Sequence, residues 1–322
     1  MTFIFKLISS IAVALMAALP VLSPLAPSGF KAKEEGILLN ASIISDTHLD
    51  VAFSPLAWFM GIGLRDMSRS QTPVDVVIVS GDLTNYGDEE SIDQFFDTLD
   101  KNWDGNVIIS MGNHDIGHVE DKTHEEARQY FVDKFNAHTG LGIEKSYYST
   151  QINGYKFITL TDESEDSWDH PDLYEEQLNF LDAELAASAN GEDPVFVVCH
   201  WPLAHTHGEE TVWDDGDMDE PYSSQVRAIL EKYENVFFIS GHLHLGLNGN
   251  FTRDEFGVSS IETQNGVHYI NLPSYGLLSR YGTLLGGRGF QMEVYEDHVL
   301  FRARNYVTHN WFDLYGSDIP LV

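Results

Sequence analysis

Five short apolar segments of this sequence each end in side chains that could bind a metal ion or transfer a proton. The endings are Asp46-Thr47-His48, Gly81-Asp82, Gly112-Asn113-His114-Asp115, His200 and Gly241-His242-Leu243-His244. Together they offer two carboxylates, four imidazoles and one amide oxygen as candidate metal ligands, from Asp46, His48, Asp82, Asn113, His200, His242 and His244. Carboxylate and imidazole ligands suit zinc, manganese or iron, whereas all-oxygen sites suit magnesium or calcium.

The number of candidate ligands indicates more than one metal ion. Seven ligands exceed what one tetrahedral ion needs, but they are a natural number for two ions that share a carboxylate. Paired ions lie about 3.5–4 Å apart and stabilise both the attacking and the leaving oxygen of an in-line displacement. They also lower the pKa of water, so that hydroxide is available near neutral pH. Phosphoryl transfer is the reaction that most needs such a site.

The five endings follow segments that have the pattern of buried strands. These β-branched, apolar segments are residues 37–45, 74–80, 106–110, 194–199 and 235–240. The segments with helical periodicity are 88–103, 123–138, 172–188 and 223–233. Alternation of strands and helices predicts parallel strands with helical crossovers, and such sheets place their sites beyond the carboxyl ends of the strands. We therefore expect the five endings to meet there.

Two other segments are typical of antiparallel strand pairs, so we expect mixed sheets. Residues 146–162 contain Asn153-Gly154, a strong hairpin signal. Residues 288–306 form a second predicted pair that turns near Glu296 and Asp297. The acidic segment 207–221 has neither period and is predicted to be a long loop, either functional or a solvated insertion.

Composition limits both the architecture and the partners. The 322 residues suit one large α/β domain. Since 18 Lys and Arg oppose 50 Asp and Glu, the formal charge is −32, and a nucleic-acid duplex or an anionic membrane surface would be repelled. Cys199 is the only cysteine, so no internal disulfide forms, and we interpret it as a buried small apolar residue rather than a nucleophile. The sequence does not indicate an oligomeric state.

The N-terminal segment is predicted to direct export. Residues 7–30 carry no charged side chain, and Lys6 precedes a long apolar segment. This pattern is typical of a secretory signal peptide over residues 1–28, with small residues suited to cleavage before Gly29. An uncleaved anchor is the alternative, because the uncharged segment approaches the roughly 20 residues that span a bilayer. Either way we expect a secreted or cell-envelope protein, with membrane contact only through that anchor.

The five endings, in this order, resemble the motif set of the calcineurin-like metallophosphoesterase family. That set reads DxH, GDxx, GNHD or GNHE, a lone histidine after a strand, and GHxH, and the resemblance covers roughly residues 40–245. It implies a four-layer α/β/β/α sandwich with mixed sheets, over residues 37–310, that hydrolyses a small phosphorylated substrate. It also implies two ions (manganese, zinc or iron). One would be held by Asp46, His48, Asp82 and His244, and the other by Asp82, Asn113, His200 and His242, with Asp82 bridging.

The same resemblance gives His114 and Asp115 catalytic roles. A metal-bridging hydroxide would attack phosphorus in line while His114 contacts the phosphate and protonates the leaving oxygen, and Asp115 would orient the imidazole. An independent argument agrees, because a leaving alkoxide needs a proton and an imidazole with an ordinary pKa near about 6.5 supplies one at neutral pH. Gly112 is expected to allow a tight turn after its strand.

Several alternatives stay open on sequence alone. The chain could be a non-catalytic binding scaffold with this fold, or a metallohydrolase of a non-phosphate ester, and monoesters and diesters are not distinguished. The loops expected at 50–72, 116–125, 201–222 and 246–260 carry no specificity signature. His205 and His207 could face the phosphate, and Tyr275 and Arg280 could close over the site.

One branch of the family, the purple acid phosphatases, fits the sequence poorly. That branch would show DxG in the first motif and GDxxY in the second, but His48 and Asn85 stand at the diagnostic positions. Tyr86 follows one residue too late. We therefore expect no metal-binding tyrosine.

Overall fold

The computed structural model describes most of the chain after the predicted signal peptide. The described residues are 29–53, 55–117, 122–165, 170–188, 191–207, 218–244, 260–276 and 286–322. The predicted signal peptide, most of the acidic segment 207–221, and Arg280 lie outside these residues. Among the helices in the described ranges, none is both long and apolar enough to cross a membrane.

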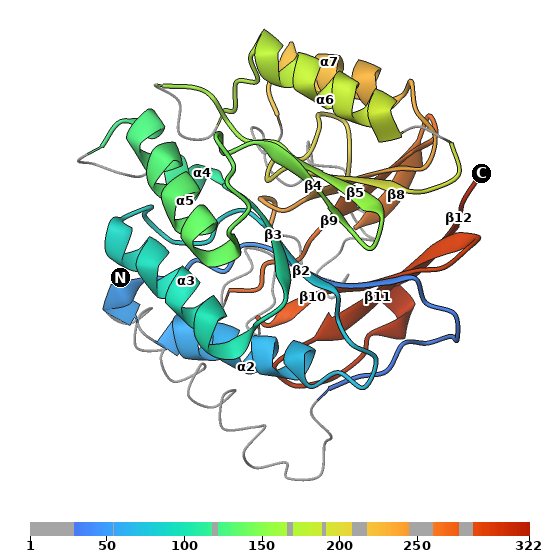
Figure 1. Cartoon of the computed structure of the whole chain (residues 1–322), viewed down its shortest axis with the longest axis horizontal. Coiled ribbons are helices and arrows are strands. Elements are labelled where there is room, and N and C mark those ends of the chain that lie inside the picture. The colour runs from blue at the N-terminus through green and yellow to red at the C-terminus, as the bar shows by residue number, and fades with distance from the viewer. Residues whose placement is uncertain are drawn as a thin grey trace.

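Two six-stranded mixed sheets form the centre of the molecule (Figure 1). The first has the order β12-β11-β10-β1-β2-β3 and the second β4-β5-β6-β7-β9-β8. Strands of the first sheet are β1 (Leu39–Ile44), β2 (Val76–Ser80), β3 (Asn106–Ser110), β10 (Arg288–Val294), β11 (His298–Asn305) and β12 (Ser317–Pro320). Strands of the second are β4 (Tyr148–Ile152), β5 (Tyr155–Thr159), β6 (Val195–Val198), β7 (Val236–Ser240), β8 (Ile261–Gln264) and β9 (Val267–Asn271).

Helices cover the outer faces of the two sheets. The helices are α2 (Pro55–Ser68), α3 (Glu89–Asn102), α4 (Asn113–Ile116), α5 (His124–Thr139), α6 (Glu175–Ser188) and α7 (Tyr222–Leu230), with short 3-10 turns η1 (Val51–Phe53) and η4 (Asp313–Tyr315). Figure 1 shows α6 and α7 at the top, beyond the second sheet, and α2 and α3 on the opposite side.

Three apolar clusters hold these layers together. One joins α2, α3 and α5 to the first sheet, one lies between the two sheets, and one joins α6 and α7 to the second sheet. Successive side chains of β2 point to opposite faces of the sheet. Val77 and Val79 belong to the cluster on the helix side, and Val76 and Ile78 belong to the cluster between the two sheets. Because both faces of the central strands are covered, the strands read as continuous apolar segments.

Most of the predicted elements are confirmed. The five strands that precede the candidate ligands are β1, β2, β3, β6 and β7, although they divide between the two sheets. Within each sheet these neighbours pair in parallel, and the predicted pairs β4–β5 and β10–β11 are antiparallel. The four predicted helices are α3, α5, α6 and α7.

The interpretation of residues 50–72 as a loop is wrong, because α2 occupies most of that segment. The buried residues of α2 run from Phe59 to Leu64 without a break, so no one-sided apolar stripe is visible in the sequence. The hairpin β8–β9 was also not predicted, although it turns at Asn265-Gly266, the same signal that marks β4–β5.

Candidate metal centre

The five endings meet where the carboxyl ends of β1, β2, β3, β6 and β7 come together. The Asp46 amide donates to the Gly81 carbonyl at 3.1 Å, which joins the ends of β1 and β2. Across the sheets, Ser80 Oγ donates to the Cys199 carbonyl at 3.1 Å. His200 Nδ1 lies 2.8 Å from the Ser80 carbonyl oxygen. Donation by this nitrogen leaves the lone pair of His200 Nε2 available as a ligand.

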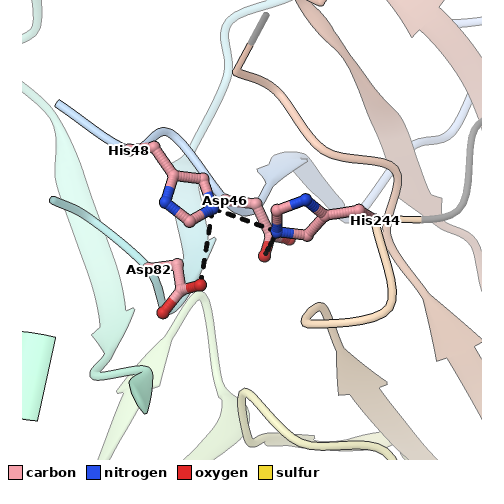
Figure 2. A group of neighbouring side chains, drawn as sticks. All are labelled: Asp46, His48, Asp82 and His244. Carbon is pink, nitrogen blue, oxygen red and sulfur yellow. Dashed lines mark hydrogen bonds and ion pairs between the residues drawn. The ribbon is translucent and has the colours of Figure 1, made fainter. Parts of the chain in front are cut away.

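The first group of ligands consists of Asp46, His48, Asp82 and His244. Each offers one ligand atom, and these atoms all lie within 4.8 Å of one another. His48 Nε2 lies 3.0 Å from His244 Nε2 and 3.4 Å from Asp82 Oδ2. His244 Nε2 also lies 3.1 Å from Asp46 Oδ1. Figure 2 shows the four side chains pointing toward one another.

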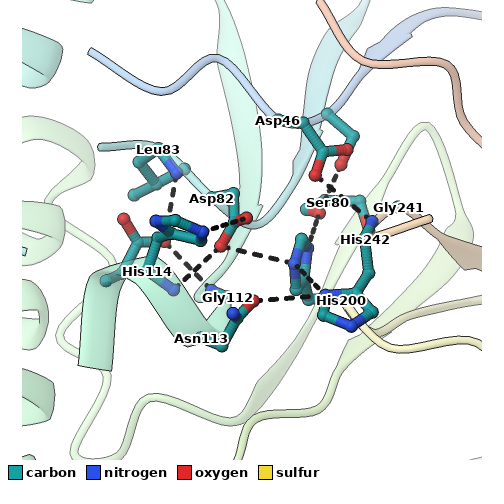
Figure 3. A network of polar contacts seen from close by, with 12 residues as sticks. Asp46, Ser80, Asp82, Leu83, Gly112, Asn113, His114, His200, Gly241 and His242 are labelled. Atoms are coloured by element: carbon teal, nitrogen blue, oxygen red, sulfur yellow. Dashed lines mark hydrogen bonds and ion pairs between the residues drawn. The ribbon is translucent and has the colours of Figure 1, made fainter. Parts of the chain in front are cut away.

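The second group consists of Asp82, Asn113, His200 and His242 (Figure 3). His200 Nε2 lies 3.3 Å from Asp82 Oδ1 and 3.3 Å from His242 Nδ1. His242 Nδ1 is 3.2 Å from the amide oxygen of Asn113. Asp82 therefore presents Oδ2 to the first group and Oδ1 to the second, as a bridging carboxylate would. The structure brings all seven predicted ligands together.

The donor set fits metal cations better than it fits hydrogen bonds among its own members. The two imidazole nitrogens of His48 and His244 that face each other at 3.0 Å accept one shared proton at most. Asp46 Oδ2 is buried and has no hydrogen-bond partner in the described structure. A buried carboxylate oxygen without a donor is costly. A divalent cation satisfies such an oxygen and the converging imidazoles at once.

The electrostatics favour positive charge between the ligands. Burial alone would raise the pKa of Asp82, but His200 and His114 hold it well below its usual range. Burial lowers the pKa of His200, yet the opposing charge of Asp82 raises it to about 9. Asp82 thus favours a cation at its contact with His200. Burial lowers the pKa of His48 and of His242 to about 3, which keeps both imidazoles neutral, as metal ligation requires.

The backbone at the ligands is strained. Five of the seven ligands have left-handed φ angles, namely Asp46 (56°), His48 (47°), Asp82 (49°), His242 (67°) and His244 (49°). Non-glycine residues rarely adopt this conformation, which costs about 1–3 kcal/mol each and concentrates at functional sites. The fold holds these side chains in convergence at an energetic cost that the remaining packing offsets.

Two glycines make room for the ligands of neighbouring strands. The expectation that Gly112 provides a tight turn is wrong, because its φ of −114° and ψ of 179° are extended and suit any residue. A Cβ at Gly112 would instead lie 2.3 Å from Asp82 Oδ1 and 2.8 Å from the ring of His200. A Cβ at Gly241 would lie 2.7 Å from Asp46 Oδ2. The missing side chain of Gly112 therefore leaves room for Asp82 and His200, and that of Gly241 leaves room for Asp46, so each of these glycines makes space for candidate ligands of other motifs.

Substitution of Gly112 by alanine is expected to lower activity by about 10²-fold, because the added methyl group displaces Asp82 and His200 and a 1 Å misplacement has an effect of this size. Steady-state kinetics with an aryl phosphate measures the effect, together with metal content per chain. Gly142→Ala is the control for a general loss of stability, since its φ of +70° strains an alanine although a Cβ there meets nothing within 4 Å, and it should keep its metal content and rate. An unchanged metal content and rate in Gly112→Ala would contradict the close approach.

His114 lies beside the ligands without joining either group. It belongs to α4, the single turn that follows β3, and its Nε2 lies 4.0 Å from Asp82 Oδ2. Its ring centroid is 4.7 Å from that of His48. Its side chain is 25% exposed, whereas that of Asp82 is 1% exposed. His114 is therefore the imidazole of the centre that is both next to the metal ligands and open to solvent.

The prediction that Asp115 orients the His114 imidazole is wrong. The Asp115 carboxylate is buried and accepts from the backbone amides of Gly112 at 3.0 Å and Leu83 at 3.1 Å. Burial and the charge of Asp82 raise the pKa of Asp115 to about 6. Among the described residues, the Asn85 carbonyl oxygen takes the predicted place, 2.9 Å from His114 Nδ1. Asp115 instead ties the ends of β2 and β3 together.

A family model matches most of the domain that contains the candidate metal centre, and this match identifies the family. The model of the family described as calcineurin-like phosphoesterase matches residues 41–246, a segment that contains all seven ligands. The chain belongs to the calcineurin-like phosphoesterase family. Membership makes it a metal-dependent phosphoric ester hydrolase, and members of the family use two metal ions.

Two solved phosphatase structures share the fold. A dimetal phosphatase from Danio rerio is 16% identical with a TM-score of 0.62, and the match covers 89% of this chain and 100% of that chain. A purple acid phosphatase from yellow lupin (Lupinus luteus) is 15% identical with a TM-score of 0.59, over 88% of this chain and 53% of that chain. The comparison with curated proteins gave no match.

The other residues singled out in the sequence lie away from the two ligand groups or outside the described structure. His205 is exposed and His207 is buried, and neither belongs to either ligand group. Tyr275, which the sequence left open as a residue that could close over the site, has its ring buried against Phe59 of α2. Arg280 lies outside the described residues. Cys199 is buried, and burial raises the pKa of its thiol to about 12, which fits a packing role.

The sequence did not reveal three groups that contact the histidines of the centre: the Trp201 ring and the carbonyls of Asn85 and Ser80. The ring of Trp201 lies 5.2 Å from that of His200 and 6.1 Å from that of His242, at the end of β6. The Asn85 and Ser80 carbonyls act through the backbone, so no side-chain signal marks them. Tyr86, which directly follows the second motif, is 49% exposed in this calcineurin-like phosphoesterase.

Proposed function

We propose that this protein is an exported phosphoesterase that hydrolyses a small phosphomonoester or phosphodiester, with His114 as the general acid. The observation that carries the proposal is the position of Asp82, whose two oxygens face two separate ligand groups while His114 lies beside them. We place the catalytic domain at residues 37–310, to which β12 adds an edge strand of the first sheet.

Asp46, His48, Asp82 and His244 would hold one ion, and Asp82, Asn113, His200 and His242 the other. When bound, the two ions supply Lewis-acid activation of water and neutralise charge on the phosphoryl group. The residues of the chain supply the rest. Buried carboxylates and neutral imidazoles fix the ligand geometry, and Trp201 excludes water from the far side of His200.

His114 would donate the proton that the leaving oxygen needs. Its Nδ1 faces the Asn85 carbonyl at 2.9 Å, so Nδ1 carries hydrogen as the donor, and Nε2 is the atom that faces the ligands and solvent. In the imidazolium form, which carries hydrogen on both nitrogens, this arrangement presents the Nε2 proton where the leaving group of a bound substrate would lie, and the ring returns to the neutral Nδ1–H tautomer after the transfer.

The complete ligand set argues against the scaffold alternative. A binding scaffold that has lost catalysis has no need for seven converging ligands, of which five are held at strained φ angles. Nothing in the ligands distinguishes a phosphate ester from another ester, but family membership favours phosphoric esters.

Removal of metal is expected to abolish turnover. Dialysis against a chelator should lower the hydrolysis rate of an aryl phosphate by at least about 10³-fold, since the ions supply several kcal/mol of charge stabilisation. Manganese or zinc should restore it, and elemental analysis of the protein as purified should find about two ions per chain, one for each ligand group. Normal turnover by the metal-free protein, or a metal content of zero with full activity, would refute the proposal. A panel of monoesters, linear diesters and cyclic nucleotides, assayed with manganese, identifies the substrate class.

A further inference from the structure

A buried ionic cluster lies at the start of the described chain, separate from the ligand groups. Its centre is Asp66 at the end of α2, which is 1% exposed, as is Arg304 on β11. Arg304 donates to Asp66 Oδ2 through Nε at 2.9 Å and Nη2 at 2.7 Å. The other oxygen, Oδ1, accepts from the backbone nitrogen of Gly29 at 2.6 Å. His309 Nε2 lies 3.7 Å from the same oxygen.

Two independent observations point to the peptide bond before Gly29. In the sequence, the signal-peptide pattern ends with small residues that suit cleavage between Ser28 and Gly29. In the structure, the nitrogen that this cleavage would release is the one that contacts a buried carboxylate.

We propose that Ser28–Gly29 is the processing site and that the new α-ammonium group of Gly29 forms a buried ion pair with Asp66. In the cleavage, an export peptidase adds water across the bond. The C–N bond breaks, Ser28 leaves with a carboxylate, and the Gly29 nitrogen takes protons to become an ammonium group. This proposal rests on export and not on the phosphoesterase activity.

The surroundings select glycine as the first residue of the mature chain. A Cβ at Gly29 would lie 2.0 Å from the Arg69 carbonyl oxygen, so no larger residue fits there. The next residue, Phe30, is 3% exposed and packs edge-on against Tyr306 and Trp311. The chain is therefore anchored directly after the proposed terminus, which holds the Gly29 nitrogen on Asp66.

The charges near Asp66 leave its Oδ1 for the ammonium group. Arg304 occupies Oδ2, and Arg69 and His309 are the other basic groups that face the cluster. Burial lowers the pKa of His309, and Arg304 and Arg69 lower it further, while Asp66 opposes them. His309 is therefore neutral at neutral pH and does not replace the ammonium group as the cation at Oδ1. Asp66 pairs with Arg304 through Oδ2 and with Gly29 through Oδ1.

Burial of Gly29 also sets the order of events. Gly29 is buried against Asp66 and the Arg69 carbonyl, so a peptidase reaches its peptide bond only before the chain folds. Cleavage must therefore precede folding, and the ion pair closes as the mature chain folds.

The first test is the N-terminus of the full chain expressed in an exporting host. Intact mass and N-terminal sequencing should show a protein that begins at Gly29. A different first residue, or retention of residues 1–28 in the folded protein, would overturn the proposal.

The second test is the reactivity of the mature α-amine in the same preparation. An exposed α-amine reacts readily with an amine-acetylating reagent, because its ordinary pKa is about 7.7–8.0. In the folded protein Gly29 should react at least tenfold more slowly than exposed Lys101, and urea should remove the protection. Asp66→Asn should restore reactivity, whereas Asp318→Asn, which removes an exposed carboxylate and leaves Lys101 untouched, should not. Native-state acetylation of Gly29 at the rate of Lys101 would overturn the ion pair even if Asp66→Asn does not fold.

Discussion

Asp82→Asn is expected to lower kcat/KM by at least about 10³-fold and to reduce the bound metal from about two ions per chain to one or none. Asp82 is the residue shared by the two ligand groups, through Oδ2 toward His48 at 3.4 Å and Oδ1 toward His200 at 3.3 Å. Asparagine keeps one oxygen but turns an N–H₂ donor toward the other group, and it removes the negative charge that favours cations there. Elemental analysis and steady-state kinetics on the same preparation measure both effects.

The asparagine side chain also keeps a contact that would otherwise confuse the result. Asp82 Oδ1 accepts the backbone N–H of His114 at 3.0 Å, and an amide oxygen in that position preserves the bond. The matched control is Glu293→Gln. The Glu293 carboxylate is buried and pairs with Arg302, and Glu293 lies on β10 opposite Asn40, which is near the start of β1 and away from the metal centre. The control should lose stability without losing metal. Two retained ions and a rate within tenfold of the wild type in Asp82→Asn would exclude the bridging role.

The convergence of the seven candidate ligands was predictable because their chemistry and their topology coincide in the sequence. Each motif follows an apolar segment, and the parallel pairing of β1 with β2 and β2 with β3 brings three endings to one edge. The parallel pairing of β6 with β7 does the same in the other sheet. A rule about the carboxyl ends of strands therefore placed the seven side chains together without any knowledge of the distances.

The parts that sequence reasoning did not reach depend on the backbone or on helices without a one-sided pattern. The Asn85 carbonyl orients His114 and the Ser80 carbonyl fixes the tautomer of His200, and any residue type provides a carbonyl. The left-handed φ angles fall on Asp and His residues, which tolerate this conformation better than most, but residue type alone does not mark which Asp and His residues adopt it. The helix α2 is buried over most of its surface, so the period of 3.6 residues is not visible.

Asp115 shows how adjacency in sequence misleads. Asp115 follows His114 directly, but the helical turn of α4 points the two side chains in different directions. The carboxylate turns back to the amides of Gly112 and Leu83, and the imidazole turns toward Asp82. The GNHD sequence thus divides between a candidate ligand, the proposed general acid and a structural tie.

His114→Ala is expected to lower kcat by about 10²–10⁴-fold for an alkyl phosphate, the range that a general acid contributes. An alkoxide leaves poorly without a proton, and Nε2 of His114 is the exposed imidazole nitrogen beside the ligands. For p-nitrophenyl phosphate the loss should be much smaller, because its phenolate leaves without protonation. A plot of kcat against the pKa of the leaving group should therefore be steeper for the variant than for the wild type.

The metal content separates this role from a role in binding the ions. Since His114 belongs to neither ligand group, the alanine variant should retain as much metal as the wild type. His138→Ala serves as the control, because His138 pairs with Asp100, between α5 and α3. An equal loss for both leaving groups would assign His114 to phosphate binding, and a loss of metal would make it a ligand. Only a leaving-group-dependent loss with full metal content identifies the imidazole as the proton donor.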